Sequence, residues 1–354
     1  MVAKSATAFL TLALFWAARL QAQGIAAGYP GDAGIQAHPD VILAEMFEEA
    51  SVAAVAARWT NVKDEGNLSI DADAAPGSPG TRSLRIAANG GSTGGHLYRT
   101  LSPGENDRIH LRYYVKYLAG NFHHSMGGLG GYNPPTPWPQ GTAGIVPSGS
   151  DHFTVQFEPV DNSTLRADFY VYWKDMQGIW GNHFIRDTAL RFTRDRWTCV
   201  EFMVRLNNPP GSANGELHVW IDGSPQGAFQ NFQWRTVSAL NLNFIWMSNY
   251  ATVSPKGALK FDHIVAARSY IGPIGGGGGA PAPAPAPGPA PAPGPGPGGG
   301  SGPTGGGGGG GSGGDNPNGD ASLNDKFCGL LGAEALIVLV LAQVARRRRA
   351  FTLR

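Results

Sequence analysis

Two tyrosines, Tyr170 and Tyr172, are separated by one residue, so a strand would place both rings on the same face. Arg166 lies an even number of residues before both tyrosines and would share their face of the strand. Gln156 belongs to a similar polar face in residues 152–158. Tyrosine rings stack on sugar rings, while phenol, amide and guanidinium groups hydrogen-bond hydroxyls or carboxylates. These faces predict a surface for a polysaccharide, with an ordinary solvated sheet face as the alternative.

A pair of histidines, His123 and His124, precedes a glycine-rich stretch and a proline-rich loop that carries Tyr132. Imidazole titrates near neutral pH, so either histidine could act as a base. The alternatives are histidines that face solvent or bind backbone, and tyrosines that serve only as a binding platform. The loop, residues 131–140, either walls a groove or caps the domain.

The elements that would position these side chains are mostly strands, because apolar and polar residues alternate through the middle of the chain. The predicted strands are 108–117, 152–158, 165–173, 197–206, 215–221, 240–248 and 260–269. One alanine-rich stretch, 48–59, predicts a helix. Many strands separated by Gly, Pro and Asn turns indicate an all-β sandwich or barrel.

Composition limits the classes of function. The chain has 354 residues, of which 25–274 are predicted to form one domain. Eight of its 27 basic and four of its 26 acidic residues lie in the terminal segments, which leaves the domain with a charge near −3 and no basic footprint for nucleic acid. The two cysteines, Cys199 and Cys328, lie in the domain and in the tail, so no disulfide is expected inside the domain.

Both ends of the chain predict export. Residues 1–23 contain Lys4, an apolar run and small residues near Ala22, which is the pattern of a signal peptide. Residues 275–326 are rich in proline, alanine and glycine and predict a disordered linker.

The last segment, 327–354, predicts a membrane helix. Its apolar part, Phe327 to Ala345, would span roughly 28 Å as a helix, and four arginines follow. Cys328-Gly329 before a hydrophobic helix and an arginine cluster resembles the C-terminal sorting signals of bacterial exported proteins, which a membrane protease reads. This resemblance implies attachment at the bacterial cell surface or outer membrane, or release after processing. An uncleaved transmembrane anchor is the alternative.

Several motifs occur in a familiar order. They are Leu-Arg-Tyr-Tyr-Val-Lys-Tyr at 111–117, Gly-Gly-Leu-Gly-Gly at 127–131, Phe-Tyr-Val-Tyr at 169–172, Trp-Thr-Cys-Val-Glu at 197–201 and Gly-Glu-Leu-His-Val-Trp-Ile-Asp-Gly at 215–223. The series is similar to bacterial polysaccharide lyases of the alginate and glucuronan type. The resemblance covers roughly residues 42–271 and implies a concanavalin A-like jelly roll.

The resemblance also implies roles for single residues. A Tyr-x-Tyr pair lies on the concave sheet of such lyases and matches Tyr170 and Tyr172. The lysine that usually occurs upstream in a Gly-Gly-Lys segment is absent from 125–131, and His123 and His124 lie just before that stretch.

Elimination across a uronate needs a base, an acid and a group that neutralises the carboxylate. The candidate catalytic residues are the base His124, the acid Tyr172 and the carboxylate partner Arg166, and the candidate substrate-binding residues are His123, Arg112, Tyr114, Tyr132, Gln156 and Tyr170. We expect an acidic polysaccharide as the partner. No cofactor or metal ligand is predicted, although a structural Ca²⁺ stays open because its ligands leave little sequence trace. A non-catalytic glycan-binding module on the same fold is the alternative to a lyase.

Overall fold

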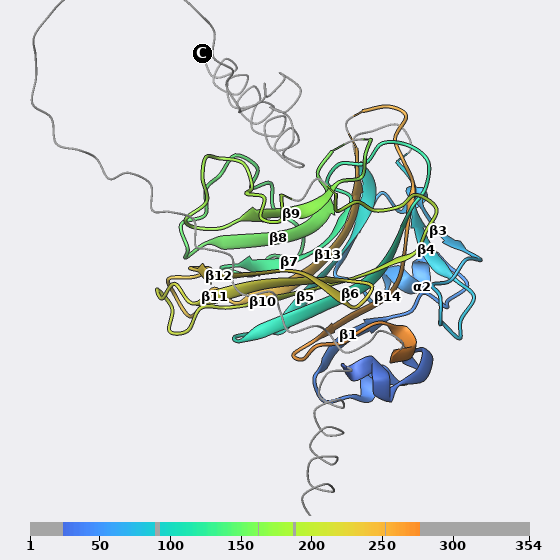
Figure 1. The fold of residues 1–354 in the computed structure, drawn as a ribbon, viewed down its shortest axis with the longest axis horizontal. Coiled ribbons are helices and arrows are strands. Elements are labelled where there is room, and N and C mark those ends of the chain that lie inside the picture. Colours follow the sequence, from blue (N-terminus) through green and yellow to red (C-terminus); the bar gives the residue numbers. More distant parts are fainter. Residues whose placement is uncertain (1–23, 89–92, 162, 187–188, 252, 277–354) are drawn as a thin grey trace, which may run out of the picture.

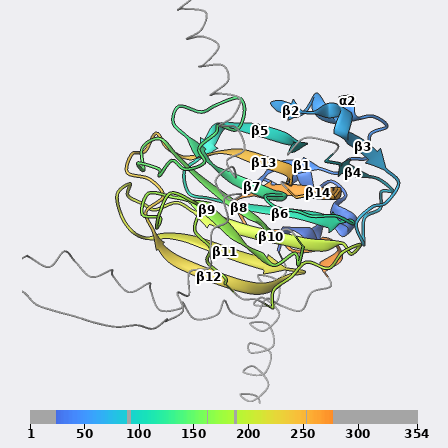
Figure 2. The same cartoon turned by 90° about the horizontal axis from the view of Figure 1, so that it is seen from above.

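The computed structural model describes residues 24–88, 93–161, 163–186, 189–251 and 253–276, which form two stacked antiparallel β-sheets (Figure 1, Figure 2). Sheet A contains β1 (Val41–Glu45), β3 (Leu68–Asp71), β4 (Ser83–Ile86), β6 (Arg108–Tyr117), β10 (Thr198–Arg205), β11 (Gly215–Ile221), β12 (Ser224–Phe232) and β14 (Leu259–Ala267). Sheet B contains β2 (Asn61–Lys63), β5 (Thr93–Glu105), β7 (Met126–Tyr132), β8 (His152–Pro159), β9 (Ala167–Tyr172) and β13 (Leu242–Tyr250). The predicted all-β sandwich is therefore confirmed.

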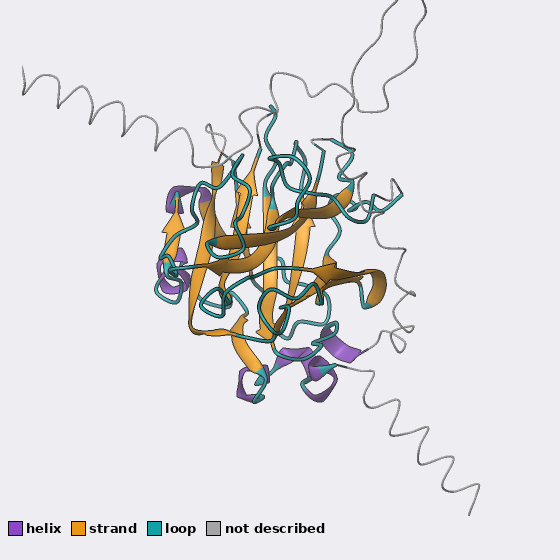
Figure 3. Ribbon diagram, turned by 90° about the vertical axis from the view of Figure 1, so that its left-hand side faces the viewer, coloured by secondary structure: helices purple, strands orange, loops and turns teal. Residues whose placement is uncertain are grey.

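The strand order is not the chain order. Sheet A runs β12-β11-β10-β6-β14-β4-β3, with β1 paired to β14, and sheet B runs β2-β5-β13-β7-β8-β9. The helical elements are short: α2 (Val52–Ala56) and the 3₁₀ turns η1 (Ile25–Gly28), η2 (Pro30–Asp32), η3 (Ile35–Ala37), η4 (Glu65–Asn67) and η5 (Ile274–Gly276). Figure 3 shows these turns at the margins of the strands.

The main core lies between the two sheets, because alternate residues of each strand point inward. Leu111 and Tyr113 of β6 meet Val155 and Phe157 of β8 in one cluster of fully buried side chains. Burying each such side chain stabilises the fold by roughly 1.5–3 kcal/mol. The polar residues of the same strands are left on the outer faces.

Strand β7 is built largely of glycine. A Cβ added at Gly127 would lie 2.3 Å from the Tyr113 ring, and one at Gly130 would lie 2.8 Å from the Phe244 ring. Glycine is therefore required where β7 passes between the core and the outer aromatic residues.

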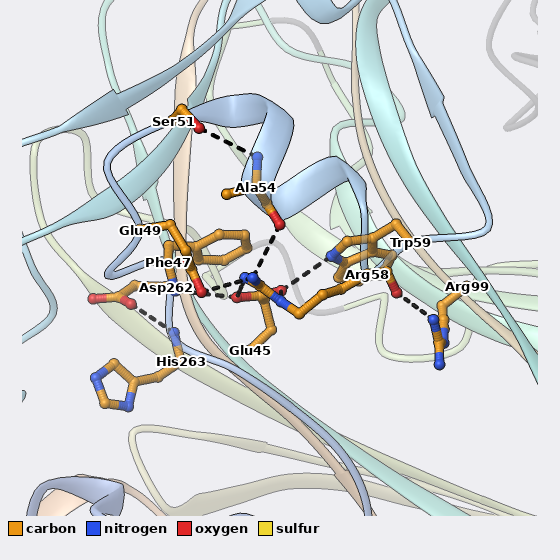
Figure 4. A network of polar contacts seen from close by, with 10 residues as sticks. All are labelled: Glu45, Phe47, Glu49, Ser51, Ala54, Arg58, Trp59, Arg99, Asp262 and His263. Atoms are coloured by element: carbon orange, nitrogen blue, oxygen red, sulfur yellow. Dashed lines mark hydrogen bonds and ion pairs between the residues drawn. The ribbon is translucent and has the colours of Figure 1, made fainter.

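The expected strands occur within two residues of their predicted bounds, but the predicted helix 48–59 is wrong in length. The helix begins after Ser51, whose hydroxyl accepts a bond from the Ala54 amide. Beyond it, Arg58 and Trp59 direct their side chains to the buried carboxylate of Glu45 (Figure 4). These contacts stop the helix after little more than one turn.

The N-terminal segment covers part of the outer face of sheet A. The buried Asp32 carboxylate accepts bonds from Arg112 at 2.5 Å and from His263 at 2.7 Å. Burial acts to raise the pKa of Asp32, but the bond from His263 and the charge of Arg112 outweigh it and hold the pKa below its usual value.

Three sequence predictions fall outside the described residues: the signal peptide (1–23), the linker beyond residue 276, and the C-terminal segment 327–354. Within the described part of the chain, no helix is both long and apolar enough to cross a bilayer.

Candidate functional site

The candidate site lies on the outer face of sheet B, at strands β8 and β9. Their register pairs Gln156 with Tyr170 and Thr154 with Tyr172. Because Phe157 and Phe169 point into the core, these four polar residues point away from it. The two polar faces predicted separately from the sequence are thus one continuous surface.

His124 reaches this surface from the loop that precedes β7. Its backbone has a φ of 55°, a left-handed conformation that turns the chain before the strand begins. The imidazole stacks on His123, with 4.0 Å between centroids, and lies 4.7 Å from the Tyr170 ring. The structure therefore brings His123, His124 and Tyr170 together.

Glu158 holds the other edge of the His124 ring. Nδ1 of His124 lies 2.5 Å from Oε1 of Glu158, and both side chains are buried. His124 Nε2 and Glu158 Oε2 are also buried, and neither atom has a hydrogen-bond partner among the described residues. Unpaired buried polar atoms are costly, which makes them a signature of a site that a ligand completes.

Burial governs the protonation of this pair. It raises the pKa of Glu158 to about 8 and lowers the pKa of His124 to about 4, because each charged form is desolvated. The sequence-based expectation that His124 titrates near neutral pH is therefore wrong for this environment. At neutral pH the pair keeps the carboxyl proton, and one hydrogen bond joins Oε1 of Glu158 and Nδ1 of His124.

The two tyrosines form the second half of the site. Their hydroxyl oxygens lie 3.3 Å apart, and the Gly144 amide donates to the Tyr172 hydroxyl at 3.5 Å. Burial raises the pKa of Tyr170 well above its usual value, so its phenol keeps its proton and can donate a hydrogen bond. The ring of His183 lies 5.6 Å from that of Tyr170.

This arrangement places one potential base and two potential proton donors on one face of the sheet. The unpaired Nε2 of His124 is a base once its ring proton resides on Nδ1, where Glu158 accepts it. Tyr170 and Tyr172 supply phenolic protons on the same face.

Two predicted substrate-binding residues lie on the other sheet, and this corrects the sequence-based expectation. Arg112 and Tyr114 are outward-facing residues of β6 in sheet A. Arg112 is completely buried against Asp32, and the Tyr114 hydroxyl accepts a bond from the Ile274 amide. The chemistry of their side chains made them candidates, but the sequence could not indicate to which sheet their strand belongs.

The remaining predicted residues stay on the sheet B side. Gln156 neighbours Tyr170 directly, whereas Tyr132 stacks on Phe244 farther along the face, with 5.0 Å between centroids. Arg166 lies just before β9, four residues or about 13 Å of strand from Tyr170. Its guanidinium lies 3.6 Å from the Asp168 carboxylate rather than against the tyrosines.

Sequence reasoning did not single out three supporting residues: Glu158, His183 and Asp168. Glu158 lies two residues after Gln156 and so shares its face of the strand, which is the sequence feature that could have identified it. Asp168 accepts backbone bonds from residues 184, 185 and 186 and so fixes the loop after β9. Nothing in the sequence pairs Asp168 with that loop, because the bonds form only after the chain turns back.

The proline-rich loop packs on the far side of the same face. The Tyr98 hydroxyl donates to the Thr136 carbonyl, and the Gln140 amide donates to the Tyr132 hydroxyl. The loop thus covers these two aromatic side chains and leaves Trp138 52% exposed. Among the described residues, no group of three or more His, Cys, Asp or Glu side chains is arranged to hold a metal ion.

Comparison with known families gives one match. A family model described as polysaccharide lyase 14 matches residues 175–251. The match is to a lyase family. It covers less than a quarter of the chain, from the loop after β9 to β13, and therefore includes His183 but begins after Tyr172. No curated protein sequence matches the chain significantly.

Among solved structures, alginate lyase Aly36B is 19% identical with a TM-score of 0.46, covering 65% of this chain and 97% of that one. Alginate lyase vAL-1 from Chlorella virus is 16% identical with a TM-score of 0.45, covering 61% and 95%. The endo-β-1,4-glucuronan lyase from the fungus Trichoderma reesei is 12% identical with a TM-score of 0.41, covering 59% and 90%.

Proposed function

We propose that this protein is a polysaccharide lyase that cleaves uronate-containing polysaccharide by β-elimination on the outer face of sheet B. One observation carries the proposal: the His124 ring, whose buried Nε2 has no hydrogen-bond partner among the described residues, lies 4.7 Å from the Tyr170 ring, and the Tyr170 hydroxyl lies 3.3 Å from that of Tyr172. The match of residues 175–251 to a polysaccharide lyase family model supports it.

In this reaction His124 Nε2 takes the proton from C5 of a uronate residue. The electron pair of the broken C–H bond forms a double bond between C4 and C5, and the bond from C4 to the bridging oxygen breaks. Tyr172 donates its phenolic proton to that oxygen, and Tyr170 lies beside it to return a proton. The products are a new chain end and an unsaturated uronate.

The substrate carboxylate must be neutralised for C5 to become acidic. Gln156 lies next to Tyr170 and offers an amide donor there. Arg166 is the nearest predicted guanidinium on this side, and it would have to share its charge with Asp168. We therefore place Gln156 at the reacting carboxylate and Arg166 at a neighbouring one.

The test is to incubate the protein with alginate and glucuronan and to follow the ultraviolet absorbance of the unsaturated product. His124→Ala and Tyr172→Phe should each lower kcat by at least about 100-fold, because each removes a proton-transfer group. Arg112→Lys is the matched control on sheet A and should keep wild-type kinetics if it folds. Absence of product from wild type on every uronate polymer would overturn the proposal.

A glycan-binding module without catalysis is the second candidate. The lysine that the resembling lyases carry in a Gly-Gly-Lys segment is missing from residues 125–131. Burial also keeps the Glu158 carboxyl beside His124 protonated at neutral pH. Retained binding of uronate polymers without product at any pH between 5 and 10 would favour this candidate.

We also propose that the protein is exported and displayed on a bacterial surface. The support is the pattern of residues 1–23 and 327–354, with the proline- and glycine-rich segment as a spacer and a membrane protease as the processing partner. Fractionating cells that express the full chain, with Cys328→Ala as the comparison, tests the location. Recovery of the full chain in the cytoplasm would contradict it.

A further inference from the structure

Exposed apolar side chains gather at one end of the candidate site. In the described residues, Ile145 and Val146 of the β7–β8 loop and Ile179 and Trp180 of the β9–β10 loop are each 37–51% exposed. A Cβ added at Gly144 would lie 3.7 Å from the Trp180 indole, so the two loops meet there. Apolar groups gathered at a surface mark an interaction site.

Both loops are tied directly to the tyrosines. The Gly144 amide donates to the Tyr172 hydroxyl, while Gly181 packs so closely on Tyr170 that a Cβ there would lie 2.8 Å from the ring. Trp180 immediately precedes Gly181 and contacts Gly144. Trp180 is thus next in sequence to the glycine that packs on Tyr170, and its indole lies next to the glycine that binds Tyr172.

We infer that Trp180 is a stacking subsite for a sugar residue next to the one that reacts at His124 and Tyr172. This inference rests on the proposed function and extends it to a specificity-determining residue. A pyranose presents an apolar face of C–H groups, which an exposed indole covers well. Ile145 and Val146 would border the same sugar.

Continuity argues for a sugar chain rather than another occupant. A polymer bound at Tyr172 must leave the site over one of the loops around it. Trp180 lies where the β9–β10 loop meets the β7–β8 loop at Gly144, whose amide binds the Tyr172 hydroxyl. Trp138 is also exposed, but its part of the loop packs toward Tyr98 of β5, which lies four strands from β9 on the same face of sheet B. Trp138 therefore serves as a matched control.

The experiment measures binding without cleavage. In the full chain carrying His124→Ala, which keeps the Tyr172 hydroxyl and its bond from the Gly144 amide, calorimetry gives the Kd for tetrasaccharides prepared from alginate and from glucuronan. Adding Trp180→Ala should raise Kd on the order of tenfold, which is the effect of losing one stacked ring. Trp180→Phe should recover most of the affinity, Trp180→Leu should not, and Trp138→Ala should change Kd by less than about twofold.

The results separate this inference from the proposed function. Loss of affinity in Trp180→Ala supports the subsite even if wild type yields no unsaturated product, and in that case only the lyase reaction is rejected. Unchanged affinity in Trp180→Ala, full recovery by Trp180→Leu, or an equal loss in Trp138→Ala would overturn it. A wild-type dimer that Trp180→Ala converts to a monomer in light scattering would also overturn it, because a second copy would then cover the patch.

Discussion

At the scale of single residues, the proton between His124 and Glu158 decides whether His124 can act as a base. While Glu158 keeps its carboxyl proton and directs it at Nδ1, the ring proton of His124 is on Nε2 and this atom cannot accept a proton. Loss of the carboxyl proton lets Nδ1 carry the ring proton and donate it to Glu158. Nε2 then has a free electron pair.

This proton predicts the pH dependence of cleavage. Because burial raises the pKa of Glu158 to about 8, the basic form of the pair appears only as the pH rises through that value. We expect kcat/KM to rise about tenfold per pH unit below about pH 8 and to level off above it.

The control for this prediction is Glu158→Gln, which has no carboxyl proton to lose. The rising limb near pH 8 should disappear from its profile, whatever the height of the remaining activity. A limb that stays at the same pH in this variant would assign the titration to another group.

For single residues, the sequence showed which residues of a strand share one face. It did not show to which of the two sheets a strand belongs. The period of two placed Gln156, Tyr170 and Tyr172 on polar faces, and the structure joins those faces. Arg112 was chosen for the chemistry of its guanidinium, and it lies in the other layer, against Asp32. Layer membership depends on pairings between strands far apart in the chain, and these leave no local signal.

At the scale of elements, α2 depends more on its anchor than on its own sequence. Five residues are too few for a helix that is stable alone, so its tertiary contacts must hold it. The buried Glu45 carboxylate supplies them, since it accepts bonds from Arg58, Trp59 and the Phe47 amide (Figure 4). The alanine-rich pattern overestimated this helix because propensity alone does not reveal such an anchor.

Removing the anchor should destabilise the protein without touching the candidate site. Glu45→Ala leaves the buried Phe47 amide and Trp59 indole without this acceptor and should lower the free energy of unfolding by about 2–3 kcal/mol, measured by urea denaturation. Glu49→Ala is the matched control, because Glu49 also pairs with Arg58 but is 33% exposed in its side chain, and it should cost less than about 1 kcal/mol. Equal losses in the two variants would show that Glu45 is not the anchor.

At the scale of the whole molecule, the outer faces of the two sheets differ in what lies on them. Sheet B presents the candidate site, whereas the outer face of sheet A is partly covered by the N-terminal segment through Asp32 and His263. The last strand, β14, pairs with β1, β4 and β6 and so joins most of the covered region.

This topology predicts where the chain can be shortened. A protein of residues 24–276 should unfold cooperatively at the same Tm as the full chain and keep its activity, because both described sheets are complete. A protein ending at residue 258 lacks β14 and should show no cooperative transition in calorimetry. A sharp transition in this shorter protein would contradict the central role of β14.

The position of β14 also has a consequence for the order of events during synthesis. The first residues of the domain contact the last strand: Asp32 and His263 are separated by 231 positions in the chain. Until a ribosome has made β14, β1 has no strand to pair with, Asp32 lacks one of its two partners, and β6 and β4 have no strand between them. Sheet A can therefore be completed only after almost the whole domain has been made.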